Sequence, residues 1–441
     1  MANQVRAVNG IGIVDVQEIN GVENTTSSQN MEKLNGSTWE YGGTTVTKAI
    51  PQTDDSIFSN SDDGFGFNAA WHSIKMLTDY RALIVWTAGG SSTGGKTFAR
   101  IAQADSGGDT ITYGTYQTIQ DSGYFNIGDI AVDTVTDNKA LYVAADEDDG
   151  NAGKAWVLSI SGTDITVNSA ATFEADATSA NTAVANDPFT ADKYLIVYDH
   201  IGDEQIQAKV CTVSGTTPSF GSMAVVGDMG DLSVDDVYYP YVEADPFNTG
   251  RYLVAWNTYV STGGDHDQRL SILQVTGTTI TVGTSVEIQS GNSEQGATWD
   301  KRTKNRIFCA VSDLNDGGKN KLTPCSVEDS VSGDGLTITK GGTQYTYYSG
   351  SGAGHANPLT DYYIPNMVLM LKGQGDGSVY SAPVTGLTLG TIATEDADFL
   401  AATTASGIRS ATDPNNAGWF WAMGRQYASG DIRAGILGGT Y

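Results

Sequence analysis

The chain has 441 residues, with 51 acidic and 24 basic side chains and a formal net charge of −27. This excess of carboxylates excludes a general binder of nucleic-acid backbones, which needs clustered Lys and Arg. No apolar stretch approaches the 18 residues of a membrane span, and the first residues lack the apolar segment of a secretory signal. We therefore expect no membrane span, no nucleic-acid partner and no export by the secretory route.

Residues 1–36 contain three Asn-Gly pairs, which begin at Asn9, Asn20 and Asn35. Asn-Gly beside apolar or alternating residues is a strong signal for a two-residue hairpin turn. The segment is too short to bury a core of its own. The sequence predicts an extended assembly arm that becomes ordered on a partner; the alternative is a leader without fixed structure. The apolar residues expected to make the assembly contacts are Val8, Ile11, Ile13, Val14, Ile19 and Val22.

From residue 69 onward one pattern recurs every 52 to 61 residues. A strand of small residues ends at an Asp, a tight turn follows, and an apolar strand begins, as in DPFTADKYLIVYD (187–199) and DPFNTGRYLVAWN (245–257). A constant period with β-type composition is typical of a toroidal or solenoid array. The equivalent positions are placed at Lys75, Asp133, Asp187, Asp245, Asp300, Asp361 and Asp413.

A second signature, a Gly-Thr turn that enters a Thr-rich strand, follows six of these positions, most clearly in GTTITVG (277–283). The copy expected after the seventh is missing at the C-terminal end, but GSTWEYG (36–42) has the same glycine spacing. The sequence therefore predicts an all-β fold, a seven-bladed β-propeller of four-stranded blades, whose strands we call a to d from the axis outward. Residues 37–50 would complete the last blade, so that 37–441 form the propeller and 1–36 the arm.

Three alternatives remain open at this point. The sixth copy, NPLTDYYIPNMVLML (357–371), lacks the tight turn, so the count could be six. The whole pattern could instead belong to a β-solenoid or to a string of sandwich domains. Terminal complementarity favours a ring, because a solenoid has no reason to exchange a strand between its ends.

The loops between strands b and c vary in length and are rich in Asp, whereas the strands stay regular. Variable loops on a rigid scaffold often carry binding sites, so we predict a weak binding face there; solvated hairpin ends are the alternative. We predict no metal site, although DEDDGN (146–151) is a weak candidate for Ca²⁺, which takes six to eight oxygens. The candidate binding residues are Asp146, Asp148, Asp149, Asp199, Asp203, Asp265, Asp267, Asp313 and Asp316, of which Asp146, Asp148 and Asp149 are the calcium candidates.

No catalytic motif stands out. The four histidines fall in different blades without metal-ligand spacing, and there is no nucleophile elbow or phosphate-binding loop. Carboxylates near the axis are expected by chance in so acidic a chain, so no glycosidase pair can be nominated. We therefore predict that the protein is not an enzyme. The odd, low cysteine count favours buried thiols, although Cys309 and Cys325 could face each other across a hairpin.

The VNGIGIV, INGV and LNG segments of the arm resemble N-terminal segments of structural proteins in tailed-bacteriophage particles. VSGTTPSFGS and VTGTTITVGTSV resemble repeats of propeller-type virion and tail proteins of phages that infect aquatic bacteria. The resemblance implies a non-enzymatic structural component of the virion, tail-associated or capsid-decorating, multimeric in the assembly and made in the host cytoplasm. Residues 1–36 would bind other virion proteins, and the propeller would face outward for host adsorption, for instance to a surface glycan.

Two functions of other classes compete with that interpretation. One is a glycan-binding adhesin or lectin propeller. The other is a secreted propeller glycosidase, which an axial pair of carboxylates lining an open pocket would favour.

Overall fold

The structure is a computed structural model, in which the chain divides into two compact units that we describe separately, Val46–Gly439 and Met1–Thr45 with Thr440–Tyr441. Up to residue 49 the structure describes seven short strands. From residue 69 to 439 it describes all but positions 78–79, 89–94, 106–110, 121–124, 137, 176–177, 233–235, 261–264, 290–291, 330–334, 350–356, 363–365, 373–377, 397–404, 413–418 and 427–431.

In the smaller unit each Asn-Gly pair separates two antiparallel strands, as the sequence predicts. Val8 pairs with Ile11, Ile19 with Val22 and Leu34 with Ser37. The side chains proposed for assembly contacts lie outside the described residues, so their role stays a prediction. The six strands are β1 (Ala7–Val8), β2 (Ile11–Gly12), β3 (Glu18–Ile19), β4 (Val22–Glu23), β5 (Lys33–Leu34) and β6 (Ser37–Thr38).

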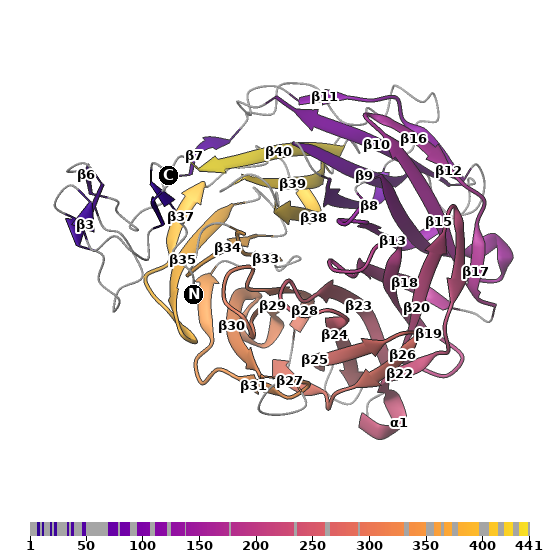
Figure 1. Cartoon of the computed structure of the whole chain (residues 1–441). Coiled ribbons are helices and arrows are strands. Elements are labelled where there is room, and N and C mark those ends of the chain that lie inside the picture. The colour runs from indigo at the N-terminus through magenta and orange to yellow at the C-terminus, as the bar shows by residue number, and fades with distance from the viewer. Residues whose placement is uncertain are drawn as a thin grey trace. The chain divides into compact units, whose positions relative to one another are not determined.

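In the larger unit the described strands pair into seven antiparallel sheets, six of them built from strands that follow one another along the chain (Figure 1). The first three sheets are β8 (Ala69–Met76) to β12, β13 (Phe125–Val132) to β17, and β18 (Thr178–Asn186) to β22. Their remaining strands are β9 (Arg81–Ala88), β10 (Lys96–Ala104), β11 (Ile111–Tyr113), β12 (Gln117–Gln120), β14 (Lys139–Asp146), β15 (Ala152–Ser161), β16 (Asp164–Val167), β17 (Ala171–Glu174), β19 (Lys193–His200), β20 (Gln205–Ser214), β21 (Thr217–Phe220) and β22 (Ala224–Asp228).

The next three sheets begin at β23 (Asp236–Ala244), β28 (Asn292–Trp299) and β33 (Asn357–Leu359). The sixth repeat thus forms a sheet as well, with a short innermost strand. The remaining strands of these sheets are β24 (Arg251–Val260), β25 (Asp265–Thr276), β26 (Thr279–Val282), β27 (Val286–Gln289), β29 (Arg306–Asp313), β30 (Lys319–Val327), β31 (Ile338–Lys340), β32 (Tyr345–Tyr348), β34 (Met367–Leu371), β35 (Val379–Thr385), β36 (Thr388–Leu389) and β37 (Ala393–Asp396).

The seventh sheet joins the two ends of this unit. It contains β38 (Ala405–Thr412), β39 (Trp419–Gln426), β40 (Ile432–Gly439) and, from the N-terminal side, β7 (Val46–Ala49). Leu437 pairs with Ala49 and Gly438 with Lys48, so the predicted closure by an N-terminal strand is confirmed. The paired strand is shorter than the predicted segment 37–50, because Ser37 pairs with Leu34 instead.

The sheets follow one another around a closed ring. Each innermost strand contacts that of the next sheet, and β38 contacts β8. Figure 1 shows these innermost strands around a common centre, with the short strands β11, β16 and β26 at the outside. The chain is therefore a β-propeller, as predicted. Among the described residues, helix occurs at α1 (Met229–Leu232) and in two 3-10 turns (Glu147–Asp149 and Leu314–Asp316), and none of these is long and apolar enough to cross a membrane.

The outer strand d differs from the prediction of a single strand. In six of the described sheets strand c pairs with two short strands; β25, for example, pairs with both β26 and β27. The interruption begins at Gly283, where an added Cβ would lie 2.6 Å from the Leu336 carbonyl oxygen of the next sheet. A side chain does not fit between the backbones there, which explains the glycine that ends the Gly-Thr signature.

Aromatic side chains of strand b pack in the interior. Trp86, Tyr198, Trp256 and Trp421 are buried, and Trp256 packs in one cluster with residues of both the third and the fourth sheet. The three cysteines are free and buried. Cys309 pairs in register with Thr323 rather than with Cys325, and burial raises the pKa of the Cys325 thiol to about 12.

The Asp of the turn between strands a and b is buried and organises the turn. Asp300 Oδ1 accepts hydrogen bonds from the backbone amides of Arg302 (2.8 Å) and Thr303 (2.9 Å). Its other oxygen accepts one from Arg306 Nε at 2.6 Å. Asp245 and Arg251 repeat this pairing one sheet earlier. Asp300 thus has a structural role, holding three donors, one of them a cation six residues further along the chain.

In the first sheet the equivalent of this Asp is Leu77, not Lys75 as the repeat alignment predicts. The Leu77 amide donates to the Arg81 carbonyl at 2.8 Å, as the Asp133 amide donates to the Lys139 carbonyl at 2.9 Å. The turn is two residues shorter here, which shifted the alignment. Lys75 therefore lies on the innermost strand itself.

The same arginines also join neighbouring sheets. Arg251 donates to the side chain of Asn305 in the fifth sheet. Arg306 donates to Asn366 Oδ1 at 3.2 Å and to the Gly386 carbonyl at 3.1 Å, both in the sixth sheet. Each arginine is held by the Asp of its own turn and also donates hydrogen bonds to acceptors of the next sheet. Sheet packing in this part of the ring is therefore partly electrostatic.

We expect Arg251→Met to lower the free energy of unfolding by about 3–5 kcal/mol, because it leaves the Asp245 carboxylate buried without its cation. Lys304→Ala is the matched control, since Lys304 pairs with Asp329 on the surface and such pairs contribute little. Denaturant unfolding followed by far-UV circular dichroism measures both. Equal effects of the two substitutions would contradict the role given to Arg251.

Deletion of residues 1–49 should cause aggregation or a large fall in Tm, because it removes β7 and leaves β40 as an unpaired edge. Deletion of residues 1–36 is the control and should leave the Tm unchanged. Differential scanning calorimetry with light scattering distinguishes the two. A protein that melts at the parental temperature without β7 would show that the ring does not depend on this strand.

Candidate functional site

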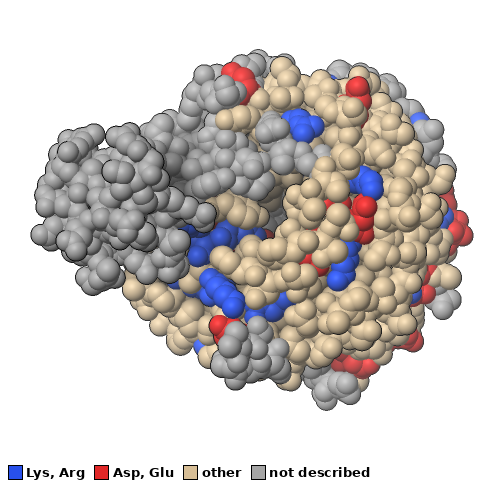
Figure 2. Space-filling view, in the orientation of Figure 1, with Lys and Arg blue, Asp and Glu red and all other residues tan. Residues whose placement is uncertain are grey.

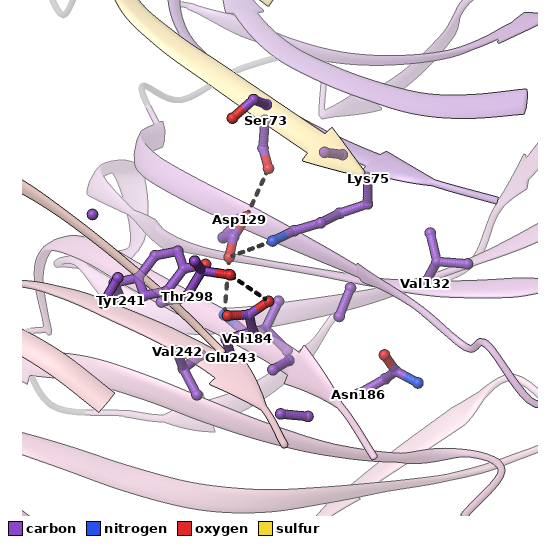
Figure 3. Close-up of a pocket in the computed structure, with 18 of the residues that line it drawn as sticks. Ser73, Lys75, Asp129, Val132, Val184, Asn186, Tyr241, Val242, Glu243 and Thr298 are labelled. Carbon is purple, nitrogen blue, oxygen red and sulfur yellow. Dashed lines mark hydrogen bonds and ion pairs between the residues drawn. The ribbon is translucent and has the colours of Figure 1, made fainter. Parts of the chain in front are cut away.

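The innermost strands surround a cavity of about 540 Å³, within the range of small-molecule sites. Residues of all seven innermost strands line it, together with some of the turns that follow them. Most of the wall is small or apolar, as expected where strands converge. The polar groups that interrupt this wall make it a candidate binding site (Figure 3).

Asp129, on β13, is the first of two carboxylates in the wall. Ser73 Oγ donates to Asp129 Oδ1 at 2.7 Å, and the Val184 amide donates to Oδ2 at 3.3 Å. Lys75 Nζ lies 4.0 Å from Oδ2. Figure 3 shows Ser73 and Lys75 pointing toward Asp129. Three consecutive sheets therefore meet at one partly exposed carboxylate.

Glu243, on β23, is the second carboxylate. It accepts hydrogen bonds from the Trp299 amide at 2.8 Å and from Thr298 Oγ1 at 3.4 Å, both on β28. The Lys301 ammonium forms an ion pair with it. Burial is the largest single effect on the pKa of Lys301 and lowers it, but the charge and hydrogen bond of Glu243, with the charges of Tyr362 and Asp245, together raise it above its ordinary value. Both axial carboxylates are thus held by donors from a neighbouring sheet.

Two amides add unpaired polar atoms to the same wall. Asn257 is 0% exposed, and neither its amide nitrogen nor its oxygen bonds to any described residue. Asn181 is 7% exposed; its nitrogen donates to Asp199 Oδ2 at 2.9 Å, and its oxygen has no described partner. Buried polar groups without partners are costly and uncommon in native proteins. These two are suited to a ligand that brings its own donors and acceptors.

The charge around the cavity differs from that of the whole chain. Although the chain is strongly acidic, Figure 2 shows Lys and Arg side chains beside the hollow at the centre of this face. Lys75 and Lys301 belong to the wall itself. The cavity therefore offers carboxylates, ammonium groups and amides together, rather than a field of one sign.

The sequence analysis missed Asp129 and Glu243 because acidic residues are common in this chain. A signal was nevertheless present. Asp129 lies four residues before the turn Asp133, and Glu243 lies two before Asp245, each on an innermost strand. A charged residue at such a position faces either a neighbouring sheet or the axis.

No described residue of the loops between strands b and c, where the sequence placed the binding face, lines this cavity; Asn257, which does, belongs to β24. In two of these loops a lysine ammonium group lies between two aspartate carboxylates. Lys154 Nζ lies 2.6 Å from Asp146 Oδ2 and 2.9 Å from Asp149 Oδ2. Lys321 Nζ lies in the same way 2.6 Å from Asp313 and 2.9 Å from Asp316. An ammonium group thus occupies the position that a bound cation would take.

The other residues of that predicted face are dispersed. Asp199 is buried against Asn181, Asp203 Oδ2 lies 3.5 Å from His200 Nδ1, and Asp148 is exposed. Asp267 is half-buried, and the side chain of Asp265 lies outside the described residues. The described part of the chain contains no group of three His, Cys, Asp or Glu side chains that could hold a metal. Binding at these loops stays a prediction.

No protein-family model and no curated protein matches the chain. Among solved structures it is similar to the BP39L lectin from Burkholderia pseudomallei, at 10% identity and a TM-score of 0.56 over 84% of this chain and 96% of the lectin. It also matches the Hadza microbial sialidase Hz136, at 9% identity and a TM-score of 0.43 over 83% of this chain and 65% of the sialidase. A third match is an α-L-arabinanase of Penicillium chrysogenum, at 11% identity and a TM-score of 0.44 over 87% and 97%. Such low identities reflect a shared fold.

The prediction that the protein is not an enzyme is corrected here. Glycosidases stand among the propellers that the chain resembles in fold. The argument against catalysis was that no pair of axial carboxylates could be named, and the structure places Asp129 and Glu243 in one cavity. The fold and the cavity are therefore open to catalysis as well as to binding.

The Glu243–Lys301 pair generates a prediction for alkaline pH. Because the Lys301 pKa lies above its ordinary value of 10.5 in the folded protein, the stabilisation is fully present below that value and is lost as pH rises through the raised pKa. We expect Lys301→Met to lower the Tm near neutral pH by a difference that stays constant until about pH 10 and then shrinks. Thermal melts of both proteins across this range measure it. A difference that already shrinks between about pH 7 and 9 would show that Lys301 titrates earlier than its contacts require.

Proposed function

We propose that the protein binds carbohydrate in the axial cavity formed by the innermost strands. The observation that carries the proposal is the placement of Asp129 and Glu243, fixed by neighbouring sheets, with the unpaired amides of Asn181 and Asn257 in one cavity of about 540 Å³. Carboxylates accept hydrogen bonds, and amides both donate and accept them, so this set complements sugar hydroxyl groups. The similar fold of a bacterial lectin supports the proposal.

Hydrolysis of a glycosidic bond is the second candidate. Most glycosidases use two carboxylic side chains, one on each side of the bond that is cleaved. Asp129 and Glu243 come from different strands, β13 and β23, of the same cavity. The chain therefore contains the side chains that such a reaction requires, and turnover is tested together with binding.

The place of the protein in a phage particle remains a prediction from the sequence. It states that residues 1–36 contact other virion proteins and that the protein is located in the virion. Carbohydrate binding by the propeller agrees with host adsorption, but the assembly role of residues 1–36 and carbohydrate binding can fail separately. If a chain without residues 1–36 were still incorporated into particles, the assembly role of this segment would be excluded and carbohydrate binding would be unaffected.

The experiment for carbohydrate binding uses a glycan array, followed by calorimetry with the glycans that bind. We expect Asp129→Asn and Glu243→Gln each to weaken binding about 10-fold or more, because a hydrogen bond to a charged group contributes about 1.5–3 kcal/mol. Asp148→Asn is the matched control, since Asp148 is an exposed carboxylate of a loop between strands b and c. The same glycans, incubated with wild-type protein and analysed by chromatography, reveal any cleavage.

The outcomes separate three possibilities. Loss of affinity in both axial variants but not in Asp148→Asn supports the proposal. Loss only in Asp148→Asn would move binding to the loops that the sequence indicated. Cleavage products that both axial substitutions abolish would establish the second candidate.

A further inference from the structure

Two exposed phenylalanines lie on the turns that border the cavity. Phe189 is 48% exposed and Phe247 is 38% exposed. Both belong to an Asp-Pro-Phe turn between strands a and b, in the third and the fourth sheet. The innermost strands of these sheets, β18 and β23, are in contact. The two rings therefore occupy equivalent positions on adjacent blades.

Both rings are carried by rigid backbone. The Phe189 amide donates to buried Asp187 at 3.0 Å, and the Phe247 amide donates to buried Asp245 at 2.7 Å. A proline precedes each Phe and fixes the backbone angle φ of its own residue. A group that is ordered before binding loses little conformational entropy when a ligand arrives. The turns thus present two aromatic faces at low entropic cost.

The turn itself does not require an aromatic side chain. Val135 takes the same position in the second sheet and Arg302 in the fifth, and their amides make the same bond to Asp133 and Asp300. A single exposed apolar residue needs no explanation. Here, however, Phe189 lines the axial cavity together with the prolines of both turns, Pro188 and Pro246. The apolar surface is therefore continuous with the polar site.

We propose that Phe189 and Phe247 form an outer subsite, so that the protein binds a chain of several sugars rather than a single one. This rests on the function proposed above. One face of a sugar ring consists largely of C–H groups and packs on an aromatic ring, while its hydroxyl groups reach polar partners. Sugars in the cavity bond to Asp129 and Glu243, and sugars further along the chain stack on the two phenylalanines. A protein partner would need a larger apolar surface, since stable interfaces bury more than about 1,000 Å².

The test is calorimetry on the full chain with malto-, cello-, xylo- and arabino-oligosaccharides of one to six sugars. For the wild type we expect affinity to rise with length over the first three or four sugars of the series that binds. Phe189→Ser and Phe247→Ser should each lower affinity for the longest members at least 5-fold and leave the shortest binding member unchanged. Val135→Ser is the matched control, because it makes the same change at the same turn position of another sheet.

Four results would overturn the proposal. If neither Phe variant changed the affinity for the longest oligosaccharides, the rings would not bind sugar, and a protein partner would be the remaining ligand for them. An equal loss for short and long chains would show that the rings only support the cavity. A matching loss in Val135→Ser would show a general effect of the turn. Failure of the wild type to bind any member of these series or any glycan of the array would remove carbohydrate binding itself, a result distinct from the first three.

Discussion

The backbone ladder between β40 and β7 is the constraint on which the remaining structure depends. It joins the last strand of the larger unit to its first, and only with both does the seventh sheet have four strands. A cavity lined by all seven innermost strands exists only in a closed ring, because an open array would bring the first and last strands to different places. The few hydrogen bonds between Leu437–Gly439 and Val46–Ala49 therefore support a site made of residues far from them in the sequence.

Within the ring, the side chains that hold the sheets together also prepare the site. Asp129 bonds to β8 and β18 and is itself on β13, and Glu243 on β23 bonds to β28. These contacts fix the positions of both carboxylates while leaving part of each exposed to the cavity. Preorganisation of this kind limits what a ligand must order on binding. The hydrogen bonds that join the sheets are thus the same ones that position the two carboxylates.

The repeat architecture, the closing strand and the Asn-Gly hairpins could be predicted from the sequence because each depends on local turn chemistry. Asp before a tight turn, Gly-Thr at the next turn and Asn-Gly in the arm are recognisable without tertiary information. The site could not be predicted, because Asp129 and Glu243 differ from other acidic residues only by the strand that carries them. The reason for the glycine at 283, the close approach of Leu336, could not be read from the sequence because it lies in the next sheet. The first turn was predicted at Lys75 rather than Leu77 because this turn is two residues shorter than the others.

The closing strand also has a consequence for how the molecule comes into being. Val46 is the first residue of the larger unit to leave the ribosome, and its partner Gly439 is the last residue of that unit to do so. During most of translation β7 is therefore without its sheet, and the earlier blades form before the circle is complete. Pairings between distant segments form slowly, because the chain must close a long loop before it gains the contact. We expect the pairing of these two strands to be the last step in forming the larger unit, which keeps an unpaired strand edge until then.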